Sequence, residues 1–175
     1  MNDDVEIQEY FVLVKSVSEF DQRLLTVKSW GVTLSLGGLG FGFQYRSYGM
    51  FLVAAASSLA FWSLEGAMKR HQMRFYPRLR EIEVNRYARA SDQDRRFSAP
   101  RTDWSWVQAG KLFRGALAEP DLPPQPSRPN KAYALAWLLP HVALPHAITF
   151  LIGALLFVLG CLDYLGGFQL GGAKP

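Results

Sequence analysis

Two histidines stand in a repeated dipeptide near the C-terminal end of the chain, because Pro140-His141 is followed five residues later by Pro145-His146. Histidine changes its charge near neutral pH, so it can relay protons, bind a metal ion or sense pH. On an ideal helix this spacing places the two rings about 140° apart, which does not suit chelation of one metal ion by both. We therefore predict no metal site. Interfacial hydrogen bonding is the ordinary role for these histidines, and control of ion passage is the functional alternative.

Glu65 is the third candidate for chemistry, because it stands at the end of an apolar run, four residues before Lys69. Acidic side chains inside a membrane often mark ion pathways. A carboxylate four residues before a lysine is also an ordinary ion pair on a helix surface. The shallow position of Glu65 favours the ion pair, with transport as the alternative. The candidate residues for polar gating are thus Glu65, His141 and His146.

Other arrangements with known chemistry are missing from the sequence. Cys161 is the single cysteine, which excludes an intramolecular disulfide and a cysteine metal cluster. There is no phosphate-binding loop, no nucleophile elbow and no pair of histidines at zinc-protease spacing. The glycine-rich residues 37–42 lie within an apolar run that no strand precedes, so we reject a nucleotide site there. We expect a protein that is not an enzyme and that has no catalytic residues, metal or cofactor.

Three uncharged apolar runs must position these residues: 29–45, 47–64 and 132–162. A bilayer core about 30 Å thick needs roughly 20 helical residues, so the first two runs are near the lower limit. The third run is long enough for an interfacial lead-in before the prolines and a span after them. The sequence therefore predicts an all-α integral membrane protein with three transmembrane helices, in which a hairpin (29–64) is followed by a C-terminal element (132–165).

The basic residues predict the orientation of these spans. Of the 19 Lys and Arg residues, 14 lie between residues 67 and 131, whereas the turn between the first two runs holds only Arg46. Cytoplasmic loops keep the excess of Lys and Arg. We therefore expect the N-terminal segment 1–28 and the central segment 65–131 to be cytoplasmic, and the Arg46 turn and the glycine-rich tail 166–175 to be extracytoplasmic. The compact chain, without eukaryotic targeting signals, indicates a bacterial inner membrane.

The segments outside the spans carry helical patterns. Apolar residues recur every three or four positions in 1–28, and a capping box formed by Ser16 and Glu19 predicts a break near residues 16–18. A strand is the alternative for the first element. Pro77 should kink or restart the helix that follows the second span. Further on, a helix containing Trp104 is either interfacial or a small packing helix, and a proline-rich linker follows it.

The central basic segment could bind nucleic-acid phosphates, but its position beside a span favours anionic lipid headgroups over nucleic acid. The predicted headgroup contacts are Lys69, Arg70, Arg74, Arg78, Arg80, Trp104 and Trp106. Small residues in the first two runs allow helices to approach closely. The predicted helix-packing residues are Gly31, Ser35, Gly38, Gly42, Ala56 and Ala60. Packing within the chain is the main expectation for them, and contact between subunits is the alternative.

These features predict a small non-enzymatic membrane protein that acts as an anchoring, scaffolding or signal-responding subunit. Its expected partners are the bilayer and either a second copy or another membrane protein. The alternative function is an oligomeric pore or channel, such as a membrane-permeabilising effector, with the glycine-rich span at the conduit. Three spans cannot enclose a water-filled path in one chain, so this alternative requires self-association. An enzyme at the inner leaflet is the third option, and it lacks a candidate nucleophile.

Overall fold

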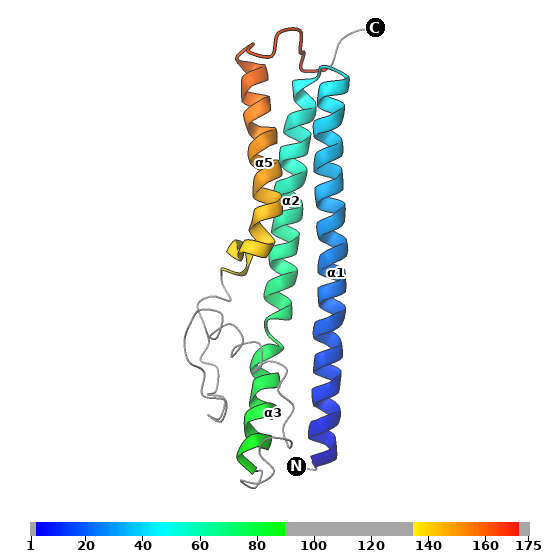
Figure 1. The fold of residues 1–175 in the computed structure, drawn as a ribbon, viewed down its shortest axis with the longest axis vertical. Coiled ribbons are helices and arrows are strands. Elements are labelled where there is room, and N and C mark those ends of the chain that lie inside the picture. The colour runs from blue at the N-terminus through cyan, green and yellow to red at the C-terminus, as the bar shows by residue number, and fades with distance from the viewer. Residues whose placement is uncertain (1–2, 90–134, 172–175) are drawn as a thin grey trace, which may run out of the picture. The chain divides into compact units, whose positions relative to one another are not determined.

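The computed structural model describes residues 3–89 and 135–171. This part of the chain is all-helical, which confirms the all-α part of the predicted fold class. Its elements are α1 (Asp3–Gln44), α2 (Tyr48–Gln72), α3 (Tyr76–Arg89), the 3-10 helix η2 (Ala136–Leu138) and α5 (Pro140–Cys161) (Figure 1). The predicted helix with Trp104 and Trp106 and the proline-rich linker lie outside the described residues.

The chain divides into two compact units. The first, here called the α3 unit, contains α3 and the part of α1 before residue 20. The second, the α5 unit, contains residues 20–70 and the described residues from 135 onward, and therefore holds most of α1 and α2, η2 and α5.

The α3 unit pairs the first turns of α1 with α3 around a small core of Tyr10, Leu79 and Ile82. The phenol of Tyr10 donates a hydrogen bond of 2.9 Å to Glu83 at the edge of this core. α1 runs through residues 16–18 without interruption, because the Ser16 hydroxyl donates to the Val12 carbonyl one turn earlier and caps nothing. The predicted break, and the alternative of a strand, are therefore wrong.

Ion pairs complete the contact between α1 and α3. Arg78 donates to both carboxylate oxygens of Glu9, at 2.8 and 2.7 Å, and its third nitrogen lies 3.0 Å from Glu81. Arg89 lies 2.9 Å from Glu6. Arg78 was predicted to contact lipid headgroups, but two carboxylates of its own unit already neutralise it. The hydrogen bond from Arg78 also lowers the pKa of Glu9.

This pair gives the α3 unit a specific pH dependence. Since the pKa of Glu9 in the fold lies below its ordinary value of 4.5, the pair stabilises the fold above that pH and loses its effect as the pH falls through the folded pKa. We expect Glu9→Gln to lower the thermal midpoint at about pH 7, and the difference from the wild type to shrink as the pH falls below 4.5 and through the folded pKa of Glu9. Thermal unfolding of the two proteins in detergent, followed by circular dichroism, measures this. A difference that is constant over the whole range would contradict it.

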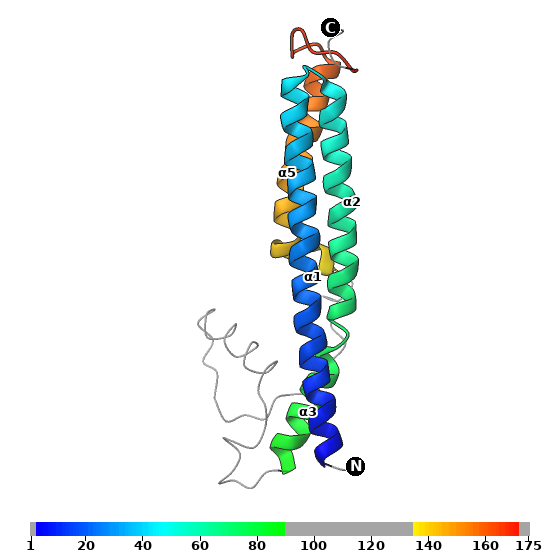
Figure 2. The same ribbon diagram turned by 90° about the vertical axis from the view of Figure 1, so that its right-hand side faces the viewer.

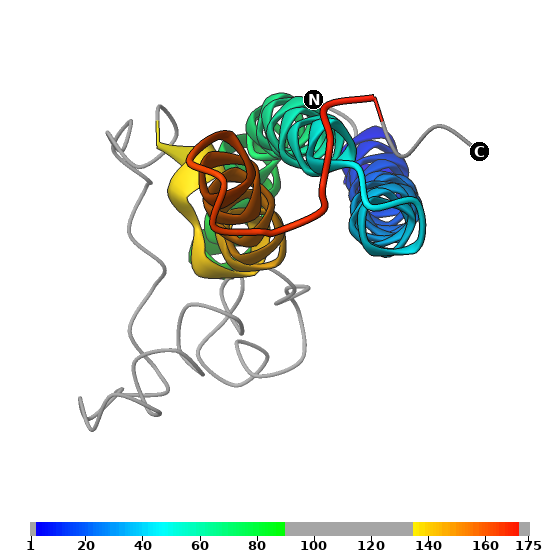
Figure 3. The ribbon, with the colours of Figure 1, turned by 90° about the horizontal axis from the view of Figure 1, so that it is seen from above.

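In the α5 unit, α1, α2 and α5 lie side by side, as the views from two sides and from above agree (Figures 1, 2 and 3). Small residues form the contacts. The predicted packing residues Gly31, Ser35, Gly38 and Gly42 are all buried on one face of α1. On α2 the inward residues are Ala54, Ala55 and Ser58. Ala56 and Ala60, predicted to pack, are exposed instead, because the buried face of α2 is set by its register against α1 and α5.

The close approach of α1 and α2 requires glycine at position 38. A Cβ atom built on Gly38 would lie 3.0 Å from the Ala54 Cβ, whereas one built on the adjacent Gly37 meets nothing within 4 Å. We expect Gly38→Ile to lower the free energy of unfolding by about 1–3 kcal/mol through overpacking. Gly37→Ile is the matched control, because it makes the same change of helix propensity on an open face. Equal effects of the two substitutions, measured by denaturant titration in detergent, would contradict the close contact.

The tail after α5 folds back onto the turn between α1 and α2 (Figure 3). The amide of Gln169 donates to the Arg46 carbonyl at 2.9 Å, the amide of Tyr48 donates to the Gln169 carbonyl at 3.1 Å, and the Ser47 hydroxyl donates to the Leu170 carbonyl. Phe168 packs against the buried Leu39, Phe51 and Ala54. The tail and the Arg46 turn therefore occupy the same end of the α5 unit.

Two described helical segments are long and apolar enough to cross a membrane. They are Tyr48–Arg86, in which α3 follows α2 after a turn at residues 73–75, and Pro140–Cys161. Only 33% and 22% of their apolar windows are buried, unlike the core helices of soluble proteins. The predicted first span, 29–45, is not among these segments, because its five glycines and its polar residues lower its hydropathy.

Candidate functional site

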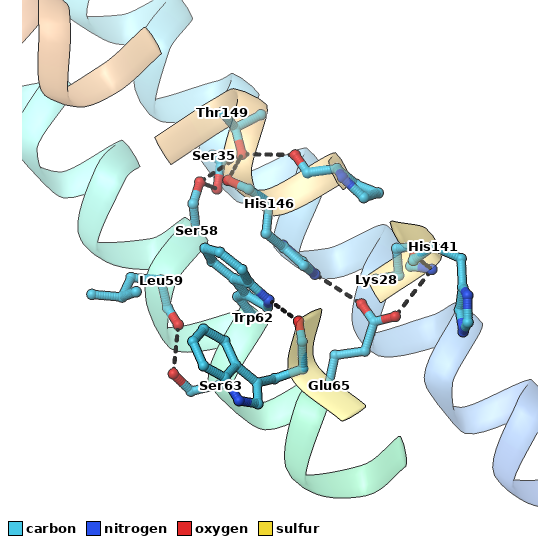
Figure 4. A network of polar contacts seen from close by, with 12 residues as sticks. Lys28, Ser35, Ser58, Leu59, Trp62, Ser63, Glu65, His141, His146 and Thr149 are labelled. Atoms are coloured by element: carbon cyan, nitrogen blue, oxygen red, sulfur yellow. Dashed lines mark hydrogen bonds and ion pairs between the residues drawn. The ribbon is translucent and has the colours of Figure 1, made fainter. Parts of the chain in front are cut away.

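A group of polar side chains is buried where α1, α2 and α5 meet (Figure 4). It consists of an ionisable part, formed by Lys28, Glu65 and His146, and a hydroxyl part, formed by Ser35, Ser58 and Thr149. Each part draws one side chain from each helix. Burial of polar groups between helices whose outer surfaces are apolar is costly unless the groups satisfy one another.

Glu65 is the centre of the ionisable part. One of its carboxylate oxygens lies 2.8 Å from His146 Nε2, and the other lies 3.0 Å from Lys28 Nζ. The side chains of Glu65 and His146 are 2% and 0% exposed, whereas that of Lys28 is 25% exposed. The carboxylate is thus shared between a cation from α1, with partial access to solvent, and an imidazole from α5, with none.

Pro145 explains why Lys28 is bound to α5 as well. A proline has no amide hydrogen, so the carbonyl four residues earlier in the helix loses its usual donor. That carbonyl belongs to His141, and it accepts a hydrogen bond of 2.7 Å from Lys28 Nζ. Lys28 therefore fills the gap that Pro145 opens in α5 while it pairs with Glu65, and it ties α1 to both neighbouring helices.

Gly31 allows His146 to lie against α1. A Cβ atom at position 31 would fall 2.9 Å from His146 Cε1 and 2.7 Å from the Phe61 Cβ. Heavy atoms do not approach so closely, so a larger residue here would force Phe61 or the imidazole to shift. The glycine that the sequence marks as a packing residue is therefore also part of the site.

The hydroxyl part lies beside His146 and is centred on Ser58. Its hydroxyl donates to the Ser35 hydroxyl at 2.7 Å and lies 2.7 Å from the Thr149 hydroxyl. The Thr149 hydroxyl is also within 3.1 Å of the carbonyls of Pro145 and His146. Toward the Arg46 turn, the buried core of the described residues continues with apolar side chains.

His146 retains one buried nitrogen, Nδ1, for which the described residues provide no hydrogen-bond partner. The carboxylate of Glu65 can only accept, so Nε2 carries the hydrogen in their contact. Nδ1 is then an acceptor in the neutral ring and a buried donor in the protonated ring. An unsatisfied buried donor costs about 1–3 kcal/mol, so uptake of a proton at Nδ1 favours a rearrangement that gives it a partner.

The structure brings two of the predicted gating residues together and separates the third. Glu65 and His146 are in contact, whereas the His141 ring is exposed and only its carbonyl takes part. The two histidines point to different sides of α5 because they are five residues apart in the helix. Glu65 does not pair with Lys69 as expected, because Lys28 of α1 occupies its second oxygen; Lys69 lies 3.8 Å from Asp21.

Sequence reasoning missed Lys28, Ser58 and Thr149. Lys28 does carry a signal, because it directly precedes an apolar run, and a long cationic side chain at such a boundary can extend along a helix toward polar groups. Ser58 and Thr149 carry none, because single hydroxyl residues are common in apolar helices.

The remaining predicted headgroup residues are placed as follows. Arg70 and Arg74 are exposed, and Lys69 and Arg80 are half-buried. Trp104 and Trp106 lie outside the described residues. At the end of the α5 unit where α5 begins, Trp62 and Trp137 are in contact, with ring centroids 5.8 Å apart. The Trp62 indole donates to the Trp137 carbonyl at 2.7 Å.

No protein-family model, curated protein or solved structure matches this chain. The chemistry of the site is therefore the basis for its interpretation. Within residues 3–89 and 135–171, no three His, Cys, Asp or Glu side chains are placed to hold a metal ion. What the arrangement can do is hold three helices together through a carboxylate that contacts an ammonium and an imidazole.

Proposed function

We propose that this chain is an integral membrane protein with three transmembrane helices, formed by residues 29–44 of α1, by α2 and by α5. In this proposal it is a non-enzymatic, signal-responding subunit that is anchored in a bacterial inner membrane. The single observation that carries the proposal is the Glu65 carboxylate, buried between helices with apolar outer surfaces and shared by Lys28 and His146. Intramembrane ionisable groups are costly and are a functional hypothesis by default.

The distribution of side chains supports membrane insertion. The α5 unit buries hydroxyls, an imidazole and a carboxylate and exposes large apolar residues, which is the reverse of a soluble protein. α1 takes part despite its glycines, because these face inward at positions 31, 38 and 42. Its exposed residues include Leu34, Leu36, Phe41 and Phe43.

Charge supports the orientation with the N-terminus in the cytoplasm. Lys28, Lys69 and Arg70 lie at the end of the α5 unit where α5 begins, whereas Arg46 lies at the opposite end, beside the tail. The rule that Lys and Arg stay inside then places the Arg46 turn and the C-terminal tail outside.

The proposed signal is the binding of a proton to the Glu65–His146 contact. Histidine is the side chain that changes charge near neutral pH. The charged and titratable groups around the pair are Lys28 and Asp21 on α1, Lys69 on α2 and the His141 ring on α5. A proton added at His146 changes its contact with Glu65 and leaves a buried donor, so the packing of α5 against α1 and α2 should respond.

Cysteine accessibility in intact cells tests the membrane topology. In a Cys161→Ser background, we expect Arg46→Cys and Gln169→Cys to react with an impermeant maleimide from outside, and Val12→Cys to react only after lysis. Recovery of the protein in the soluble fraction, or labelling of Val12→Cys in intact cells, would contradict the proposal.

Spin labels at the exposed positions Leu25 of α1 and Leu144 of α5 test the response to protons. We expect their distance distribution in liposomes to change between about pH 7.5 and about pH 5.5. Glu65→Gln and His146→Gln should each abolish the change. A wild-type distribution that stays constant, or a change that both variants keep, would overturn the proposed response without affecting the topology result.

An oligomeric pore is the second candidate, and the open faces of Gly37 and Gly40 favour it. A Cβ atom on either residue would meet nothing within 4 Å, so α1 carries small residues that no described part of the chain packs against. Leu39, Phe51 and Ala54 close the single bundle, so a conduit needs several copies. A protein that is monomeric in mild detergent, or liposomes that show no ion flux at any pH, would eliminate this candidate.

A further inference from the structure

A cavity of about 240 Å³ lies beside the Trp62–Trp137 contact, at the end of the α5 unit where α5 begins. Its lining residues are Trp62, Ser63, Gly66, Ala67, Arg70, Ala136 and Trp137. The two walls come from α2 and η2, which are distant in sequence. Gly66 makes their approach possible, because a Cβ atom there would lie 2.6 Å from the Trp137 Cβ.

Within the described residues, 3–89 and 135–171, the charge of this cavity has no counter-charge. Arg70 is the only ionisable side chain among the described lining residues, and it forms no ion pair with them. By contrast, Lys28 pairs with Glu65, and Lys69 lies near Asp21. A guanidinium with free donors forms bidentate hydrogen bonds with phosphate oxygens.

We propose that this cavity binds the phosphodiester headgroup of an anionic phospholipid of the cytoplasmic leaflet. The inference rests on the proposed membrane insertion. Arg70 binds the phosphate beside the Trp62–Trp137 contact. The two rings then occupy the interfacial level that such rings prefer. The cavity holds a headgroup only, so the acyl chains lie along neighbouring apolar surface, where Leu59 and Leu138 are exposed.

Two features favour an anionic lipid over other phosphates. The described lining residues include no carboxylate to pair with the ammonium of a zwitterionic headgroup, so net negative charge is preferred. The tryptophans and the exposed leucines beside the cavity match the boundary between headgroups and acyl chains, whereas inorganic phosphate uses only the guanidinium.

Native mass spectrometry of the full chain, released from nanodiscs of phosphatidylcholine with and without phosphatidylglycerol, tests the site. We expect each chain to retain one phosphatidylglycerol in preference to phosphatidylcholine. Arg70→Gln should lower the occupancy of this lipid roughly tenfold, because the variant loses a charge-assisted hydrogen bond. Arg23→Gln is the matched control, because Arg23 is an exposed cation of the same unit outside the cavity. Trp137→Ala should also weaken retention while it keeps the charge.

The outcomes separate the possible failures. Equal losses in Arg70→Gln and Arg23→Gln would show general attraction to basic residues and overturn the site. Displacement of the lipid by millimolar inorganic phosphate, or equal retention of phosphatidylcholine, would also overturn it. In these cases the protein still enters nanodiscs and the proposed topology stands. Failure to enter nanodiscs at all would overturn both.

Discussion

Replacing Lys28 with methionine should lower the free energy of unfolding by about 3 kcal/mol. Loss of one partner from a buried ion pair typically costs about 3–5 kcal/mol, because the remaining charge is left without compensation. Here the remaining charge is Glu65, whose side chain is 2% exposed. Methionine keeps most of the apolar stem of lysine, so lost packing contributes little. Titration of the folded protein in mixed micelles with a denaturing detergent measures the change.

Two further variants show whether the cost comes from the pair. Lys28→Met combined with Glu65→Gln removes both charges and keeps a polar group beside His146, so it should recover most of the lost stability. Lys15→Met, at an exposed position of the same helix, should change little. If the double variant is as unstable as the two single changes added together, Lys28 does not act through Glu65.

Replacing Leu151 with arginine should abolish stable insertion of α5. Leu151 lies at the middle of Pro140–Cys161 and is 64% exposed. In a soluble protein, a charge at such a position is harmless. At the centre of a membrane-spanning helix, arginine costs about 2.5–3.5 kcal/mol on insertion scales. The share of protein that remains in the membrane after carbonate extraction measures the effect.

Val12→Arg is the matched control for this prediction. Val12 is 63% exposed, almost the same as Leu151. The two positions differ in what we expect to surround them, which is water for Val12 and lipid for Leu151. As a residue of the cytoplasmic part of α1 in our proposal, it should tolerate arginine within about 0.5 kcal/mol, as surface positions do. Similar behaviour of the two arginine variants would show that α5 does not lie in lipid.

If the α5 unit lies in lipid as proposed, its buried polar groups and its apolar exterior have one physical explanation. Apolar burial does not drive the association of helices in lipid, so packing of small residues and hydrogen bonds between helices must supply it. Gly38 against Ala54 supplies the first, and Ser58 between Ser35 and Thr149 supplies the second. The ionisable part adds a contact between all three helices, in which Glu65 joins Lys28 of α1 to His146 of α5.

The sequence alone determined the helical class, the positions of α2 and α5, and the candidates Glu65 and His146. These follow from local properties, because the length of an apolar run, its charges and its prolines act within a few residues. The predicted break near Ser16 failed for a related reason. Its capping signal is local and weak, whereas Val14 and Val17, on either side of Ser16, pack against the core of the α3 unit in a continuous helix.

Only the tertiary structure decided what these residues contact. Glu65 could have paired with Lys69 along α2, but the register of α1 brings Lys28 to it, and the carbonyl exposed by Pro145 fixes Lys28 there. Likewise, Ala54 and Ser58 lie on the packed face of α2. Which face of α2 is packed depends on the positions of both α1 and α5. Such partners are distant in sequence, and the energy that selects them exists only after three helices have come together.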